Sequence, residues 1–174
     1  FIETDIQNFK VIDSLLKKEK YDALLHFAGY IQVEESVHNP KKYFDNNTKN
    51  AKILFDTCVT NNLTKIIFSS TAAAYGDSNN KPILEKDILK PLNPYGESKV
   101  LTENYIKNNK KINYIIFRYF NVAGADPSMR SGLISKKSTH LIKIISEVAV
   151  GKRSKVIIFG DDYPTYDGTA VRDY

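Results

Sequence analysis

The sequence predicts a partial α/β fold, a doubly wound parallel sheet with helices on both faces. Short apolar runs alternate along the chain with segments of helical periodicity, and this order is typical of right-handed β–α–β crossovers. The run at residues 65–70 is apolar through its middle, as expected of a strand covered on both faces. Because ligands bind such sheets at the carboxyl ends of the strands, functional residues are expected just after each strand.

The individual elements follow from capping residues, prolines and apolar spacing. Asn8 is placed to cap the first helix, whose apolar face includes Phe9 and Ile12. Pro40 and Pro94 suit the first turns of two later helices. The expected elements are, in order, a strand end at 1–6, a helix at about 9–19, a strand at 22–27, a helix at about 40–61, a strand at 65–70, a loop at about 72–93, a helix from 94 to about 109, a strand at 114–119, a helix at 138–150 and a strand at 156–159.

The composition narrows the function classes. The chain has 174 residues, 42% of them hydrophobic, and a net charge of +5, which is compatible with an anionic small substrate. No basic stripe is interleaved with aromatic residues, so nucleic acid is not an expected partner. No apolar run approaches the ~20 residues of a membrane span. His26 and His38 have no metal-ligand neighbours at useful spacing, and no metal is expected. The single cysteine, Cys58, lies in a helical pattern and is expected to be buried.

Tyr95 and Lys99 form the first candidate for chemistry. Their spacing of four residues puts both side chains on one helix face. A phenol is a poor base at neutral pH, but a nearby ammonium favours the phenolate and is expected to lower the pKa of Tyr95. Tyr95 could then exchange a proton with a substrate hydroxyl. A tyrosine and a lysine on a solvated helix face would give the same spacing.

Three strand ends carry further candidates. Phe27, Ala28 and Gly29 follow one strand, and small residues there let a flat ligand approach the backbone, although they also suit helix packing. The next strand ends in residues 69–71, Ser-Ser-Thr, whose hydroxyls could bind a sugar or cap the following segment. The third strand ends in residues 118–121, Arg-Tyr-Phe-Asn. The aromatic rings could form one wall of a ligand site, with the asparagine amide bonding the ligand. Alternatively, an aromatic ring belongs to the core and the asparagine to a turn.

Taken together, these motifs resemble the extended short-chain dehydrogenase/reductases. The resemblance is closer still to the UDP-glucose 4-epimerase family and extends over nearly the whole chain. Its most specific part is the segment 159–174, which contains Phe-Gly-Asp-Asp-Tyr-Pro-Thr and Val-Arg-Asp-Tyr. The residues His26 to Gly29 and Tyr75 to Asp77 match further family segments.

The resemblance implies tightly bound NAD and a UDP-hexose substrate. Tyr95 would take the proton of the sugar 4-hydroxyl, Lys99 would hold the nicotinamide ribose, and Thr71 would bridge the sugar O4 and Tyr95. Cofactor contacts are expected at Asp5, Ile6, Phe27, Ala28, Gly29, Asn46, Ser69, Tyr95, Lys99 and Phe120. Substrate contacts are expected at Thr71, Tyr95, Tyr119, Asn121, His140, Leu141, Ile157, Phe159 and Arg172. His140 departs from the asparagine common at its position.

The resemblance also implies an organisation. Residues 1–121 would form part of an NAD-binding Rossmann domain, and residues 122–174 would begin the substrate-binding region. The family opens with a G-x-x-G-x-x-G turn that the eight glycines here do not form, so the chain is expected to be the middle of a longer protein. The resemblance further implies a cytoplasmic homodimer that pairs through the helices at about 40–61 and 95–109.

The expected function is the interconversion of UDP-glucose and UDP-galactose, and three alternatives stay open. The enzyme could act on another UDP-hexose or a UDP-N-acetylhexosamine. It could be a nucleotide-sugar 4,6-dehydratase, although such enzymes carry an Asp-Glu pair where Ala72 and Ala73 follow Thr71 here. Outside enzymes, the chain could be an inactive Rossmann-type fragment or binding module, for which a damaged catalytic set would be expected.

Overall fold

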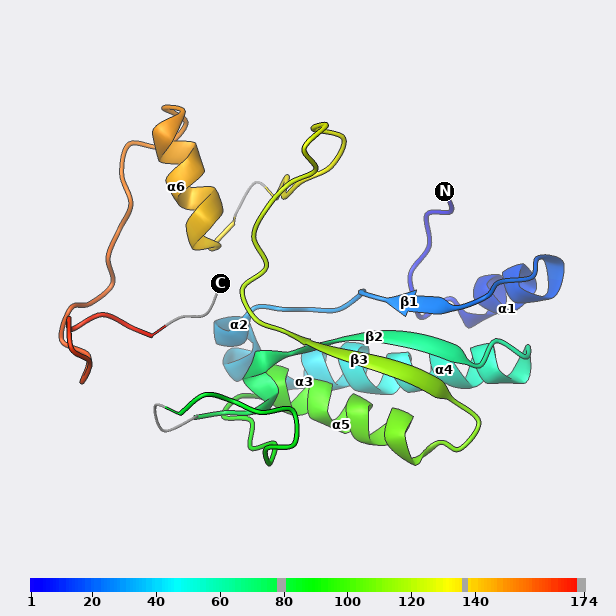
Figure 1. Ribbon diagram of the computed structural model, residues 1–174. Coiled ribbons are helices and arrows are strands. Elements are labelled where there is room, and N and C mark those ends of the chain that lie inside the picture. Colours follow the sequence, from blue (N-terminus) through cyan, green and yellow to red (C-terminus); the bar gives the residue numbers. More distant parts are fainter. Residues whose placement is uncertain (78–80, 136–137, 172–174) are drawn as a thin grey trace. The chain divides into compact units, whose positions relative to one another are not determined.

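A computed structural model of the chain describes residues 1–77, 81–135 and 138–171 (Figure 1). The chain divides into two compact units, residues 1–119 and 120–174. The first unit contains a three-stranded parallel sheet in the order β1-β2-β3, formed by β1 (Leu24–His26), β2 (Lys65–Thr71) and β3 (Asn113–Tyr119). The sequence-based prediction of parallel strands is therefore confirmed for this unit.

The helices of the first unit differ in two respects from the prediction. The expected helix at about 40–61 is a succession of three elements, α3 (Pro40–Tyr43), a π-helical segment η1 (Phe44–Asn50) and α4 (Ala51–Thr60). A short helix that the sequence did not suggest, α2 (Val33–His38), precedes them. The other helical elements are α1 (Phe9–Lys18), the 3-10 turn η2 (Ala72–Ala74) and α5 (Pro94–Asn108).

The two faces of the sheet have different environments. On one face, Ile66 and Phe68 of β2 join Phe55 of α4 and Ile106 of α5 in the buried core, and Figure 1 shows α4 and α5 running along the sheet. The neighbouring residues of each strand point the other way, where Leu25 and Ile115 are 57% and 52% exposed. Helices α4 and α5 therefore fix one face of the sheet, and their N-terminal residues reach the carboxyl ends of the strands.

The second unit is less regular than the sequence suggested. Its helix α6 spans Leu141–Ala149, within the expected range of 138–150. The prediction of a strand at residues 156–159 is wrong, and so is the prediction of a strand end at residues 1–6, because neither segment is part of a sheet. The apolar side chains of 156–159 are exposed in this unit, with no neighbouring strand among the described residues to pair with them. None of the described helices has the length and apolarity needed to cross a membrane.

Candidate active site

The N-terminus of α5 is built by its own sequence. Asn93 is the N-cap, and its side-chain oxygen accepts the backbone N–H of Gly96 at 2.8 Å, which satisfies one of the free donors of the first turn. Pro94 occupies the first helical position, where no backbone N–H is required. Tyr95 and Lys99 consequently lie one turn apart on the helix, close to the end of β2.

The structure brings Tyr95 and Lys99 onto the last residues of β2. The Tyr95 hydroxyl lies near the Thr71 hydroxyl, and hydrogen bonding from Thr71 acts to lower the pKa of the phenol. The Lys99 ammonium donates to the backbone carbonyl of Ser69 at 2.9 Å and lies 5.0 Å from the centre of the Phe68 ring. The alternative in which Tyr95 and Lys99 face solvent is therefore wrong for Lys99, which is buried, and Tyr95 is half-buried.

The electrostatics of this pair differ from the expectation. Burial raises the pKa of Tyr95, and the hydrogen bond with Thr71 lowers it, with a net increase. The lowered pKa expected from Lys99 is wrong for this arrangement because desolvation of the phenol dominates. Burial also lowers the pKa of Lys99 to about 8. The ammonium thus sits where its charge is costly, beside a carbonyl oxygen that compensates part of that cost.

Gly96 permits the close approach of α5 to the turn that follows β2. A Cβ atom at this position would lie 2.7 Å from the Ala73 carbonyl oxygen and 3.0 Å from Pro91 Cβ. Thr71 caps that turn, since its hydroxyl accepts the backbone N–H of Ala73 at 3.2 Å. Any side chain at Gly96 would therefore push Tyr95 away from Thr71.

A second small residue, Gly29, lets Asn47 and Lys99 pack closely against the backbone that follows β1. A Cβ atom at Gly29 would meet the Asn47 side-chain oxygen at 3.0 Å and the Lys99 nitrogen at 3.3 Å. Asn47 is buried and is fixed by Tyr30, whose backbone N–H and carbonyl each bond the amide at 2.9 Å. The Asn47 amide is occupied by these bonds, so of the two groups beside Gly29 the Lys99 ammonium is the one with donors for the hydroxyls of a ligand.

Aromatic side chains surround this position at the strand ends. Phe27, which follows β1, lies with its ring 6.3 Å from that of Tyr119 at the end of β3, and both rings are exposed. Tyr43 of α3 packs edge-on against Tyr95 at 6.3 Å. The exposed rings of Phe27 and Tyr119 provide the apolar surface against which a planar ring such as nicotinamide could stack.

Other expected cofactor residues lie in different settings. Asp5 and Ile6 occupy the turn before α1, where the Asp5 carboxylate accepts the backbone N–H of Gln7 at 2.8 Å. The Asn46 amide donates to the side-chain oxygen of Asn47 at 3.2 Å, so it supports Asn47. Ala28 is exposed, next to Gly29. The roles of these residues toward a cofactor remain predictions.

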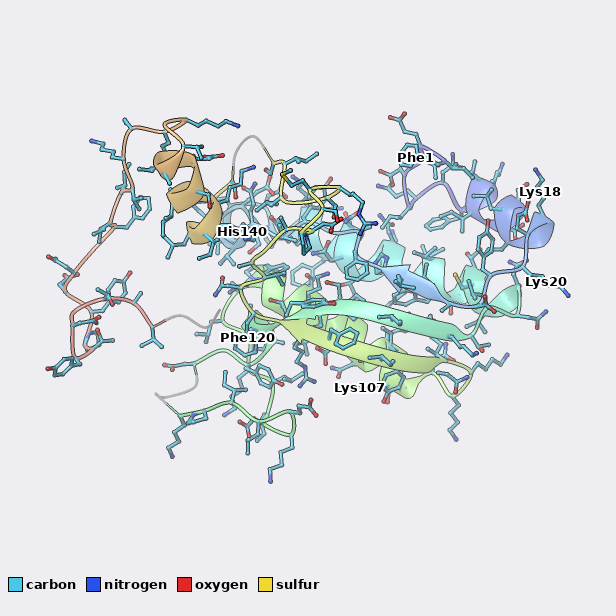
Figure 2. All side chains as sticks on the ribbon, turned by 45° about the horizontal axis from the view of Figure 1, so that its top comes forward. Phe1, Lys18, Lys20, Lys107, Phe120 and His140 are labelled. Atoms are coloured by element: carbon cyan, nitrogen blue, oxygen red, sulfur yellow. The ribbon has the colours of Figure 1, made fainter. Side chains whose placement is uncertain are left out.

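The expected substrate residues of the second unit gather around one cavity. Its volume is about 370 Å³, and its lining consists of Asn121, Thr139, His140, Leu141, Ile144, Arg153, Val156, Ile157 and Phe159. Five of these were expected from the sequence, and Figure 2 shows His140 at the start of α6. Phe120 begins this unit and is exposed. Arg172 lies outside the described residues.

Sequence reasoning missed several polar residues that the structure places around these sites. Asn47 was overlooked in favour of its neighbour Asn46, and Arg153 was not singled out in the second unit. Glu103 was also missed, although its spacing of four from Lys99 continues the same helix face. That spacing was the available signal, whereas nothing in the sequence distinguished Asn47 from Asn46.

One buried group near the site, His26, has no evident ligand role. His26 is buried between the rings of Phe55 and Phe68, and its Nε2 atom has no hydrogen-bond partner among the residues that the structure describes. Burial and the charge of Lys99 lower the pKa of His26 to about 4, so it is neutral at pH 7. Within the described part of the chain, no cluster of three or more His, Cys, Asp or Glu residues could hold a metal ion.

This fold and this set of residues place the chain in a known class. It belongs to the NAD dependent epimerase/dehydratase family, whose sequence pattern matches residues 1–174. The UDP-glucose 4-epimerase of Azospirillum brasilense is 43% identical over 99% of this chain, and that of Streptococcus mutans is 48% identical over 88%. These matches cover 51% and 47% of the two relatives, so the chain spans about half the length of the curated relatives it matches.

Solved structures give the same result. The UDP-glucose 4-epimerase from Bifidobacterium longum, in complex with NAD+ and UDP, superimposes with a TM-score of 0.92 at 35% identity, covering 99% of this chain and 53% of that one. The UDP-Glc/GlcNAc 4-epimerase from Campylobacter jejuni gives a TM-score of 0.75 at 46% identity, covering 97% and 53%. These likenesses confirm the predicted Rossmann-like fold class.

The contact at Gly96 gives a testable prediction. Alanine has a higher helix propensity than glycine by about 1 kcal/mol, so Gly96→Ala would stabilise an unconstrained helix. We expect it instead to destabilise the protein by about 1–3 kcal/mol, because the added Cβ overlaps the Ala73 carbonyl. Urea unfolding monitored by circular dichroism measures this change.

The control is Asn104→Ala on the exposed face of the same helix, which should be neutral or slightly stabilising. A gain of stability in Gly96→Ala equal to that of the control would show that α5 does not pack closely against the turn after β2.

Proposed function

We propose that the protein acts as a UDP-hexose 4-epimerase that interconverts UDP-glucose and UDP-galactose with bound NAD. The observation that carries the proposal is the hydrogen bond between Tyr95 and Thr71 beside the buried ammonium of Lys99. Its relatives of 38% to 48% identity are named UDP-glucose 4-epimerases, which supports the same activity here. We also propose the division of labour implied by the sequence, with the first unit holding the cofactor and the second the sugar nucleotide.

The residues of the first unit have separate tasks in this reaction. Tyr95 accepts the proton of the sugar 4-hydroxyl and later returns it, while the Thr71 hydroxyl holds the sugar O4 within hydrogen-bond reach of Tyr95. Lys99 donates to the ribose of the cofactor with the N–H groups that its bond to the Ser69 carbonyl leaves over. NAD, when bound, supplies the oxidant for the sugar C4 and a positive charge that favours the Tyr95 phenolate.

The cavity of the second unit suits the nucleotide end of the substrate. Ile144, Ile157 and Phe159 give it an apolar wall for the uracil ring, and Asn121 and His140 add polar groups at its edge. Such a combination of apolar walls and a few polar groups is typical of a small-molecule site. The predicted diphosphate contact of Arg172 completes this part of the proposal.

The alternatives receive less support from the described residues. A 4,6-dehydratase requires an additional acid and base, whereas Thr71 is followed by the turn Ala72–Ala74, which carries neither. A non-catalytic module predicts a damaged catalytic set, yet Thr71, Tyr95 and Lys99 lie together. We propose a UDP-N-acetylhexosamine as the second candidate substrate, because the similar Campylobacter jejuni enzyme is named for UDP-Glc and UDP-GlcNAc.

We further propose a cytoplasmic homodimer, for which the family resemblance is the support, with α4 and α5 as the paired helices. Leu101 of α5 is 39% exposed on this surface. Sedimentation equilibrium should therefore give twice the chain mass of 19.8 kDa, and Leu101→Glu should lower it toward one chain. A monomer at micromolar concentration, with no change in Leu101→Glu, would contradict the dimer.

The catalytic role of Tyr95 can be tested in a chimera. Residues 1–174 would replace the matched segment of the Azospirillum brasilense enzyme, which is 43% identical to them. The chimera should convert UDP-galactose to UDP-glucose, and Tyr95→Phe should lower kcat by about 10²–10⁴-fold, because the proton acceptor is lost. The conversion is measured by chromatography of the two sugar nucleotides.

Tyr114→Phe is the matched control, since Tyr114 is exposed on β3, and its turnover should stay unchanged. Equal turnover in Tyr95→Phe and Tyr114→Phe would refute the role of Tyr95. Conversion of UDP-GlcNAc in preference to UDP-galactose would favour the N-acetylhexosamine reading instead.

A further inference from the structure

Glu103 is a carboxylate in a place where a charge is expensive. Its side chain is 0% exposed, and it lies on α5 one turn after Lys99 and two turns after Tyr95. Burying an ion costs several kcal/mol unless its partners are arranged to compensate. An apolar residue would fill this position at lower cost, so the presence of a carboxylate calls for a physical reason.

Both oxygens of Glu103 are fully engaged. Oε1 accepts the Ser70 hydroxyl at 2.5 Å and Arg118 Nε at 2.9 Å. Oε2 accepts Arg118 Nη2 at 2.7 Å and Lys107 Nζ at 3.0 Å. Burial raises the pKa of Glu103, but the bonds from Arg118, Ser70 and Lys107 outweigh it and leave the pKa lowered. The group is therefore ionised at neutral pH and bound on every side.

Arg118 carries the connection beyond Glu103. Its guanidinium forms two parallel bonds to the carboxylate, the geometry that combines strength with a fixed orientation. The remaining nitrogen, Nη1, donates to the Tyr75 hydroxyl at 2.7 Å and to the Glu85 carbonyl at 3.1 Å. Arg118 belongs to β3, so Glu103 ties α5 to β3 and to the segment that follows the turn after β2.

Two of the partners of Glu103, Ser70 and Arg118, are sequence neighbours of the expected site residues Thr71 and Tyr119. Ser70 directly precedes Thr71 on β2, so the helix contacts both residues of this pair, through Glu103 and Tyr95. Lys107 contributes differently, because its side chain is 35% exposed at the end of α5 (Figure 2). The contacts of Glu103 with Ser70 and Arg118 are therefore the ones that hold α5 in a fixed position on the sheet.

We propose that Glu103 is a positioning residue: its carboxylate, held by Ser70 and Arg118, fixes the rotation and register of α5 on the sheet and thereby keeps Tyr95 on Thr71. The geometric part of this proposal is independent of the reaction. Its effect on turnover rests on the proposed epimerase function. A displacement of about 1 Å at a reacting group can cost about 100-fold in rate, so accurate placement of α5 matters.

The geometric part can be tested in the 174-residue chain by NMR. Tyrosine labelled with ¹³C at the ring carbon that bears the hydroxyl reports the ionisation of each phenol, and Tyr95→Phe identifies the Tyr95 signal. Thr71→Val sets the reference shift, because loss of the Thr71 bond raises the pKa of Tyr95. The other titratable group against Tyr95 is the Tyr43 phenol, and no variant in the series alters it.

Glu103→Asp keeps the charge but shortens the side chain by one methylene, and Ser70→Ala removes one bond without leaving an unpaired charge. Both variants should raise the pKa of Tyr95 in the direction of Thr71→Val. Lys107→Met is the control, since it leaves Ser70 and Arg118 in place, and it should leave the titration of Tyr95 unchanged. Circular dichroism establishes that each variant is folded before titration.

An unchanged Tyr95 titration in Ser70→Ala and Glu103→Asp would overturn the proposal and leave Glu103 a merely structural residue. No shift in Thr71→Val would overturn it too. In the active chimera, Glu103→Asp should lower kcat by about 10–100-fold with KM changed by less than roughly twofold. If the chimera lacks epimerase activity while the NMR shifts appear, the proposed function fails and the positioning role stands.

Discussion

Helix α5 meets strand β2 through polar and charged side chains, and this contact determines the rest of the site. Tyr95, Lys99 and Glu103 recur every four residues and meet Thr71, Ser69 and Ser70 of the strand. Each buried ion carries a desolvation cost of several kcal/mol. The contact between α5 and β2, called the seam below, is therefore stable only where the hydrogen-bond partners of these ions are correctly placed. A contact of this kind restricts the helix to one register, whereas an apolar contact tolerates small shifts.

The neighbouring side of α5, about 100° round the helix, is also fixed by hydrogen bonds. Ser98 and Thr102 lie one residue before Lys99 and Glu103, and they face the π-helical segment η1. Thr102 donates to the Asn47 carbonyl at 2.8 Å, and Thr48 donates to the Ser98 carbonyl at 2.8 Å. Irregular π-helical turns are frequent at functional sites. Here the segment bonds α5 through Thr48 and the Asn47 carbonyl, and the Asn47 amide also bonds the backbone of Tyr30.

Much of this architecture was predictable from residue patterns, but its long-range features were not. The apolar run at 65–70 and the Asn93–Pro94 start of α5 are local signals, and the structure confirms both elements. The π-helical segment depends on contacts with α5 that no local pattern reveals. The raised pKa of Tyr95 results from burial, which spacing cannot measure. The strand predicted at 156–159 has the right composition but lacks a partner strand among the described residues of its unit.

The titration of Lys99 tests the central claim most directly, because its ammonium can be desolvated only if α5 is seated on β2 as described. NMR of ¹³C-labelled lysine in the 174-residue chain, assigned with Lys99→Arg, measures the pKa of this one group. The arrangement predicts a pKa of about 8, well below the ordinary value of 10.5. A Lys99 that titrates at the ordinary value would be solvent-exposed, and the seam between α5 and β2 would not exist in solution.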